Sequence, residues 1–124
     1  MRNAIYWAEI PVENFERAKT FYETIFDVEI NLVPFPRGKY GVFPLDTKQL
    51  GAGAGIVQGD NYEPSTKGTL VYLDRGDTDL NAVLSKVEKA GGKILLPKTN
   101  NEGFGYIAQF TDTEGNKIGL HSMK

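Results

Sequence analysis

The chain has no cysteine, one histidine and one tryptophan among its 124 residues. Without cysteine, disulfide bonds, thiolate nucleophiles and cysteine-based zinc sites are excluded, and a reducing compartment such as the cytoplasm is favoured. The net charge of −2 supplies no positive field to attract nucleic acid or an anionic membrane. The chain also lacks a run of about 20 apolar residues to cross a bilayer, and its N-terminal residues lack the apolar segment of a signal peptide. We therefore expect a cytoplasmic protein with neither nucleic-acid nor membrane partners.

A chain of this length is expected to form one domain around a hydrophobic core. The spacing of its apolar residues predicts two amphipathic helices. The first follows a suitable N-cap at Asn14 and buries an aromatic stripe over residues 15–26. The second follows Asp77 or Thr78 and ends at Gly91-Gly92, where glycine can adopt the left-handed conformation of a C-terminal cap.

Eight short apolar segments bounded by turn residues predict strands. They cover residues 5–10, 28–33, 39–45, 54–57, 69–73, 93–96, 105–110 and 117–122. The order strand, helix, three strands thus occurs twice. Aligning the halves places Trp7 on Leu70 with an offset of 63, and Val28 on Gly92 with an offset of 64. We predict an α+β fold of two βαβββ modules, about 1–60 and 67–124, that cover each other's open sheet faces.

Three segments resemble the vicinal oxygen chelate superfamily, which contains glyoxalases, bleomycin resistance proteins and extradiol dioxygenases. They are EIPVENFERAKTFYETIF at 9–26, VYLDRGDTDLNAVLSKVEKAGGKILLPKT at 71–99 and FTDTEGNKIGLHS at 110–122. The resemblance implies a single domain, residues 1–124, in which the two modules form a curled mixed sheet. Helices would cover its convex side, and the site would lie in its concave cup. Because family members often pair, the resemblance also implies a homodimer.

Side chains alternate along a strand, which predicts the residues that line the cup. In the last strand Ile118 and Leu120 suit the side packed by helices, so Gly119 and His121 are expected to face the cup. Trp7 and Glu9 share one face of the first strand. The expected ligand-binding residues are Trp7, Glu9, Tyr72, Phe104, Tyr106, Gly119 and His121.

Enzymes of this superfamily typically hold a divalent metal through one His, Glu or Gln side chain from each of four strands. The resemblance carries these four places to Trp7, Leu70, Gly119 and a position near 55–57. None of these residues offers a suitable side-chain ligand. We therefore predict that no metal cofactor is bound. The alternative is a relocated divalent-metal site that uses Glu9 and His121.

Glu9 is the best candidate for a catalytic residue. In an enclosed, aromatic-lined cup its carboxylate would lose solvation and could act as a general base or accept a hydrogen bond from a ligand amine. An ion pair with a cation such as Arg75 is an equally open interpretation. His121 likewise either lines the pocket or is a partly exposed imidazole at the end of a strand, bonded to backbone or water.

The GAGAG stretch at 51–55 resembles a nucleotide-binding loop, but Ile56 stands where the third glycine is required and a strand follows. Its glycines instead indicate a tight bend or a close approach to a ligand.

The interpretation we prefer is a protein that binds, and sequesters, a small apolar or partly aromatic molecule in a metal-free cup. The alternative is a lyase, isomerase or dioxygenase of the glyoxalase type with a non-standard or absent metal site. The sequence leaves open whether a reaction is catalysed, and a purely dimerising module stays a third hypothesis.

Overall fold

The computed structural model describes residues 3–124; residues 1 and 2, which the expected first module includes, lie outside the described residues. The elements are β1 (Trp7–Pro11), α1 (Phe15–Phe26), β2 (Asn31–Val33), β3 (Gly38–Val42), β4 (Gly53–Gly59), β5 (Tyr72–Asp74), α2 (Leu80–Val87), β6 (Lys93–Asn100), β7 (Tyr106–Thr111) and β8 (Lys117–Ser122). They form two mixed four-stranded sheets, ordered β1-β4-β3-β2 and β5-β8-β7-β6. Each half of the chain builds one βαβββ unit, which confirms the fold predicted from the sequence.

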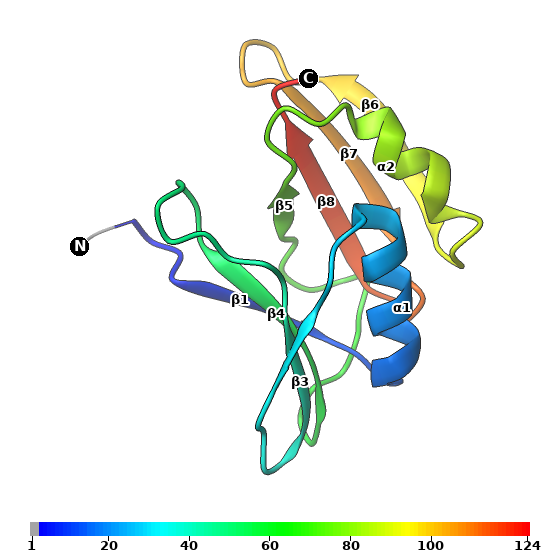
Figure 1. Cartoon of the computed structure of the whole chain (residues 1–124). Coiled ribbons are helices and arrows are strands. Elements are labelled where there is room, and N and C mark those ends of the chain that lie inside the picture. The colour runs from blue at the N-terminus through cyan, green and yellow to red at the C-terminus, as the bar shows by residue number, and fades with distance from the viewer. Residues whose placement is uncertain (1–2) are drawn as a thin grey trace.

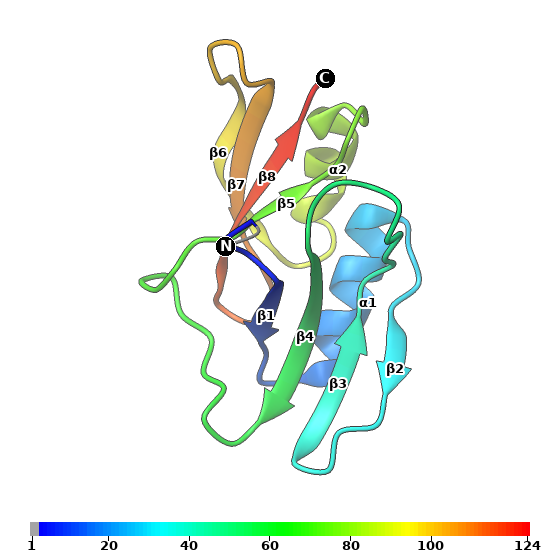
Figure 2. The same ribbon diagram turned by 90° about the vertical axis from the view of Figure 1, so that its left-hand side faces the viewer.

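The two sheets stand apart at an angle, and both helices lie on the same side of them (Figure 1). Figure 2 looks onto the opposite side, where the strands lie in front of the helices. β1 pairs in parallel with β4, and β5 pairs in parallel with β8. Within residues 3–124, β1 and β5 are therefore the inner edges of their sheets and form no ladder with each other. The curled sheet is open along this seam.

Helix α1 forms where its residues predict and packs against both units. The Asn14 side chain accepts a hydrogen bond from the Arg17 backbone N–H, and the helix ends at Asp27 with a left-handed φ of 53°. Its buried stripe consists of Phe15, Ala18, Phe21, Tyr22, Ile25 and Phe26, the face expected from the spacing. Phe21 reaches Phe110 of β7 with ring centroids 5.9 Å apart. One helix therefore contributes to a core shared by both sheets.

The start of α2 differs from the prediction. The N-cap is Asp79, whose side chain accepts from the Asn81 backbone N–H, rather than Asp77 or Thr78. Strand β6 continues to Asn100 instead of stopping at residue 96. Pro97 is accommodated because β6 is an edge strand whose pairing with β7 is irregular on both sides of Leu96.

The register of the sheets corrects the alignment of the two halves. Trp7 pairs with Gly53 across β1 and β4, and Tyr72 pairs with Gly119 across β5 and β8. Trp7 therefore corresponds to Tyr72 at an offset of 65, and not to Leu70 at 63. The two helices begin at Phe15 and Leu80, which are separated by the same 65 residues.

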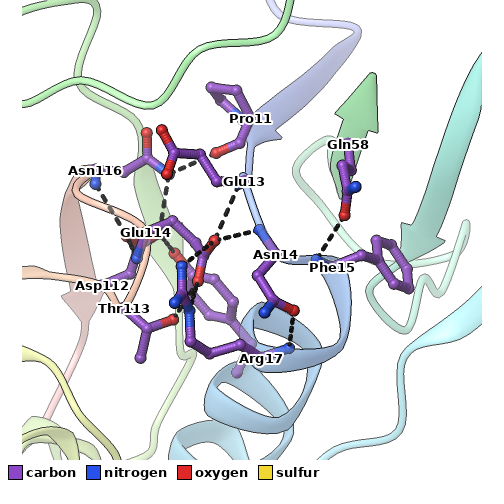
Figure 3. A network of polar contacts seen from close by, with 11 residues as sticks. Pro11, Glu13, Asn14, Phe15, Arg17, Gln58, Asp112, Thr113, Glu114 and Asn116 are labelled. Atoms are coloured by element: carbon purple, nitrogen blue, oxygen red, sulfur yellow. Dashed lines mark hydrogen bonds and ion pairs between the residues drawn. The ribbon is translucent and has the colours of Figure 1, made fainter. Parts of the chain in front are cut away.

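The turn between β7 and β8, residues 112–116, clamps the second unit onto the first (Figure 3). The Glu114 side chain is fully buried, and Oε1 accepts hydrogen bonds from the backbone N–H groups of Glu13 and Asn14 at 3.0 and 2.7 Å. Arg17 Nε donates to Glu114 Oε2 at 2.7 Å. Asn116 Nδ2 donates to the Pro11 carbonyl at 2.7 Å. Donors at the N-terminus of α1 are thus satisfied by a carboxylate from the other unit.

Asp112 supplies a second, deeper bond between the units. The Tyr22 hydroxyl donates to Asp112 Oδ2 at 2.6 Å, and both residues are buried. Burial raises the pKa of Tyr22 well above its ordinary value, and the neighbouring Asp112 carboxylate raises it further. Asp112 Oδ1 also accepts from the backbone N–H groups of Glu114 and Asn116, which fixes the turn itself.

We expect Glu114→Ala to lower the free energy of unfolding by about 2–4 kcal/mol, because two backbone N–H groups and one guanidinium lose their acceptor. Burial raises the pKa of Glu114, but hydrogen bonds from Arg17 and the Asn14 N–H outweigh it, so the net pKa is lowered. The carboxylate therefore stabilises the fold above its unfolded-state pKa of about 4.3, and this contribution is lost as pH falls through the lower folded-state value.

Urea unfolding between pH 7 and pH 3 measures this contribution. The parent protein should lose stability below about pH 5 more steeply than Glu114→Gln, which carries no titratable group at this position. The exposed Glu63→Gln serves as the matched control and should follow the parent curve. Parallel curves for the parent protein and Glu114→Gln would contradict the role given to this carboxylate.

Candidate functional site

A cleft with a volume of about 790 Å³ lies along the seam between the two units. Its walls are β1 on one side and residues 69–75, which include β5, on the other. The loop between β3 and β4 and the C-terminal end of α1 also contribute. The lining includes Trp7, Glu9, Phe26, Phe43, Tyr72 and Arg75. The cleft is therefore mainly apolar and aromatic, with a few charged groups, as small-molecule sites commonly are.

Trp7, Tyr40 and Glu9 form a hydrogen-bonded chain on the first sheet. Trp7 Nε1 donates to the Tyr40 hydroxyl at 2.7 Å, and that hydroxyl donates to Glu9 Oε2 at 2.8 Å. Burial raises the pKa of Tyr40 to about 12, and the hydrogen bond to Glu9 adds to this rise while the one from Trp7 opposes it. Tyr40 therefore stays protonated at neutral pH and holds the carboxylate in one orientation.

Two glycines of the GAGAG stretch make room for these aromatic rings. A Cβ at Gly53 would lie 2.5 Å from Cζ3 of Trp7, and a Cβ at Gly55 would lie 2.5 Å from Cε1 of Tyr40. The expected close approach does occur here, but it is to the protein's own rings. Any larger residue at either position would displace a ring.

The second unit repeats this arrangement. A Cβ at Gly119 would lie 2.5 Å from Cδ1 of Tyr72, so the Tyr72 ring covers this glycine. The Tyr72 hydroxyl accepts a hydrogen bond from Gln109 Nε2 at 2.8 Å. Tyr72 lines the cleft, whereas Gly119 lies beneath the ring and outside the cleft lining.

The corrected register also moves two of the places at which the resemblance would put metal ligands. Trp7 and Gly119 keep their places. Gly53, the register partner of Trp7, replaces the position near 55–57, and Tyr72, the register partner of Gly119, replaces Leu70. Three of these four residues have no group that ligates a divalent metal, and the Tyr72 hydroxyl is engaged by Gln109. Two aromatic rings lying on two glycines do not fit a metal ion.

His121 links β8 to two neighbouring segments. Nδ1 lies 3.1 Å from Asp74 Oδ1, and Nε2 lies 2.7 Å from the Phe104 carbonyl oxygen. Both partners are acceptors, so the doubly protonated imidazolium satisfies both, and the hydrogen bond to Asp74 raises the pKa of His121. The imidazole is partly exposed at the end of β8 and contacts one backbone carbonyl, but its other partner is a carboxylate rather than backbone or water, and His121 lies outside the cleft lining. Glu9, bonded to Tyr40, is not among its partners, and no cluster of three or more His, Cys, Asp or Glu side chains occurs within residues 3–124.

Two aromatic residues expected in the cup lie elsewhere. Phe104 sits on the loop between β6 and β7, is 73% exposed, and is outside the cleft lining. Tyr106 shares the parity of the buried Ala108 and Phe110 on β7 and packs against the core that the helices cover. Tyr106 therefore lies on the face of β7 that the helices cover, and not in the cleft as expected.

The environment of Glu9 also differs from expectation. Glu9 is exposed at the mouth of the cleft, so its carboxylate is not desolvated. No ion pair joins it to Arg75, whose guanidinium stacks on Phe26 with Cζ 4.6 Å from the ring centroid. Tyr40, the hydrogen-bond partner of Glu9, was not predicted from the sequence. The sequence did contain a signal for aromatic rings at this place. The residues at 53 and 55 are small, and a flat ring can lie across a strand only over small residues.

Comparison with known proteins defines the family. The family model of the Glyoxalase/Bleomycin resistance protein/Dioxygenase superfamily matches residues 4–120. The chain belongs to this superfamily. It is 27% identical over 117 residues to CFP32 of Mycobacterium bovis and of Mycobacterium tuberculosis, which is named as a provisional glyoxylase. The match covers 92% of this chain but 43% of CFP32, so the chain spans less than half the length of these curated relatives.

Solved structures share the fold. A glyoxalase/bleomycin resistance protein from Albidiferax ferrireducens superposes with a TM-score of 0.74 at 17% identity, covering 97% of this chain and 98% of that one. The fosfomycin resistance protein FosX from Listeria monocytogenes superposes with a TM-score of 0.67 at 17% identity, covering 98% and 92%. Within residues 3–124, neither helix is long and apolar enough to span a membrane.

Gly53→Ala should displace the Trp7 ring and change its fluorescence, because the new methyl group would lie 2.5 Å from ring carbon Cζ3. Trp7 is the only tryptophan, so the emission spectrum reports on this ring alone. Gly68→Ala is the control, since a Cβ there meets nothing within 4 Å. An unchanged emission maximum in Gly53→Ala would contradict the placement of Trp7 over this glycine.

Asp74→Asn should lower the pKa of His121 toward its ordinary value of about 6.5, because the anionic acceptor at Nδ1 is removed. The raised folded-state pKa stabilises the protein fully below the unfolded value of about 6.5, and this contribution is lost as pH rises through the folded value. NMR titration of the single imidazole measures both proteins. Equal titration midpoints would show that Asp74 does not hold the imidazolium.

Proposed function

We propose that this chain binds a small, partly aromatic or apolar molecule in the cleft between its two units, without a metal, and so sequesters it. The observation that carries the proposal is the filling of the superfamily's metal places by Trp7 and Tyr72, each lying on a glycine. Both rings line the cleft and offer flat apolar surfaces to a ligand. The chain therefore has the fold of the superfamily without the metal-binding side chains that its usual chemistry needs.

Glu9 supplies the polar contact in this proposal. Its Oε2 accepts from Tyr40, which leaves Oε1 for a donor on the ligand. A carboxylate beside an aromatic ring suits a hydroxyl, amide or amine group. The same orientation by Tyr40 supports the second candidate function, a metal-free lyase, isomerase or dioxygenase of the glyoxalase type in which Glu9 moves a proton.

We also propose a homodimer, as the family resemblance implies. The exposed apolar side chains Leu32 and Val33 on β2 and Leu95 on β6 lie on the outer edge strands, where pairing between copies is possible. Sedimentation at micromolar concentration tests this part separately from ligand binding.

The binding proposal is tested by titrating protein treated with EDTA with benzamide, benzylamine and benzoate while following Trp7 fluorescence. At least one probe should change the emission saturably, and adding Zn²⁺, Ni²⁺, Mn²⁺ or Fe²⁺ should neither restore nor tighten binding. Glu9→Gln should lower the affinity for benzylamine at least threefold and leave the melting temperature unchanged. The exposed Glu16→Gln is the matched control.

Two results would contradict the proposal. One is stoichiometric, tight metal in the purified protein together with loss of ligand binding on its removal. The other is the absence of any saturable change with all three probes. Unfolding of Glu9→Gln would assign Glu9 to structure instead of ligand contact.

A further inference from the structure

Arg75 stands directly after β5 in the wall of the cleft. Its guanidinium lies on the Phe26 ring, and Nη2 donates to the Phe26 carbonyl at the end of α1 at 3.3 Å. The ring fixes the plane of the guanidinium, and the carbonyl fixes one of its edges. The stack on Phe26 thus sets the plane of the guanidinium before any ligand arrives.

The hydrogen-bonding capacity of this guanidinium is incompletely used. Nε is buried and has no hydrogen-bond partner, the one such side-chain atom among the described residues. Burial lowers the pKa of Arg75, which the nearby Asp74 charge partly offsets. A desolvated cationic donor without an acceptor costs free energy, and an anionic acceptor would recover it.

The acidic groups around the cleft have other partners. Asp74 Oδ1 accepts from the Gly76 N–H and faces His121 Nδ1, while Glu9 accepts from Tyr40. Asp46 Oδ1 accepts from the Lys48 N–H. No carboxylate within residues 3–124 lies within 4.0 Å of the Arg75 guanidinium. Lys117 is a second cation in the lining.

We infer that Arg75 is an anion-binding subsite, which takes the carboxylate of a small aromatic or apolar acid whose apolar part fills the cleft. Carboxylate oxygens match the planar fork of a guanidinium and form two parallel hydrogen bonds with it. Because Nε is buried, the guanidinium must turn in its own plane on the Phe26 ring for the carboxylate to reach Nε, and this turn keeps the stack. This inference rests on the proposed binding function and names the class of ligand.

The test compares benzoate with its uncharged isostere benzamide, using Trp7 fluorescence to measure affinity. Benzoate should bind at least tenfold more tightly than benzamide. Arg75→Gln should abolish this preference and leave the affinity for benzamide within twofold. Arg75→Lys should keep part of the preference for benzoate, because the positive charge remains while the planar guanidinium is lost. Arg37→Gln, an exposed arginine outside the cleft, should keep the full preference.

A second measurement keeps the inference testable if Arg75→Gln fails to fold or no aromatic probe binds. The Arg75 Nε–H signal is assigned in NMR spectra by its absence from Arg75→Lys, and the parent protein is titrated with acetate. A saturable shift of this signal supports the subsite even if the aromatic probes fail, in which case the proposed function fails alone. Equal binding of benzoate and benzamide, or an Nε–H signal indifferent to acetate, overturns the inference while the proposed function stands on benzamide binding.

Discussion

The contact between the Glu114 carboxylate and the N-terminus of α1 is the constraint on which the rest of this structure depends. It joins the turn between β7 and β8 in the second unit to the start of α1 in the first unit. The two units are thereby linked although β1 and β5 form no ladder with each other. Arg17 neutralises the buried charge, and the Tyr22–Asp112 bond lies behind it. Because the units are joined on the helix side, the seam between their inner strands stays open. The cleft lies along this open seam.

The surface that faces this seam shows how a superfamily fold can keep its shape without its usual ligands. In each unit an aromatic side chain lies over a glycine directly opposite in the register, Trp7 over Gly53 and Tyr72 over Gly119. Each ring is oriented by a hydrogen bond, from Trp7 to Tyr40 and from Gln109 to Tyr72. Aromatic surface therefore occupies positions where coordinating side chains are expected, and binding becomes the function that the geometry supports best.

The sequence predicted elements well and side-chain partners poorly, for identifiable reasons. The periodicity of α1 gave its whole buried face, and the internal repeat gave two units in the correct order. The alignment of the repeat was wrong by two residues at the first strand, because short apolar segments match at several offsets and register is set by pairing across the sheet. The place of Tyr106 depends on which face of β7 packs against the helices, and Tyr106 shares that face with the buried Ala108 and Phe110. Long-range partners such as Tyr40 for Glu9 depend on the approach of β3 to β1 across β4, which no local pattern encodes.

The central claim is that the seam between the units is a metal-free site for a small molecule. A crystal structure of the metal-stripped protein soaked with benzoate tests it most directly. The account predicts density for the aromatic ring beside Trp7, with its carboxylate on the Arg75 guanidinium. A metal ion coordinated by protein side chains in the seam, or a seam closed by its own side chains with benzoate bound elsewhere, would contradict it.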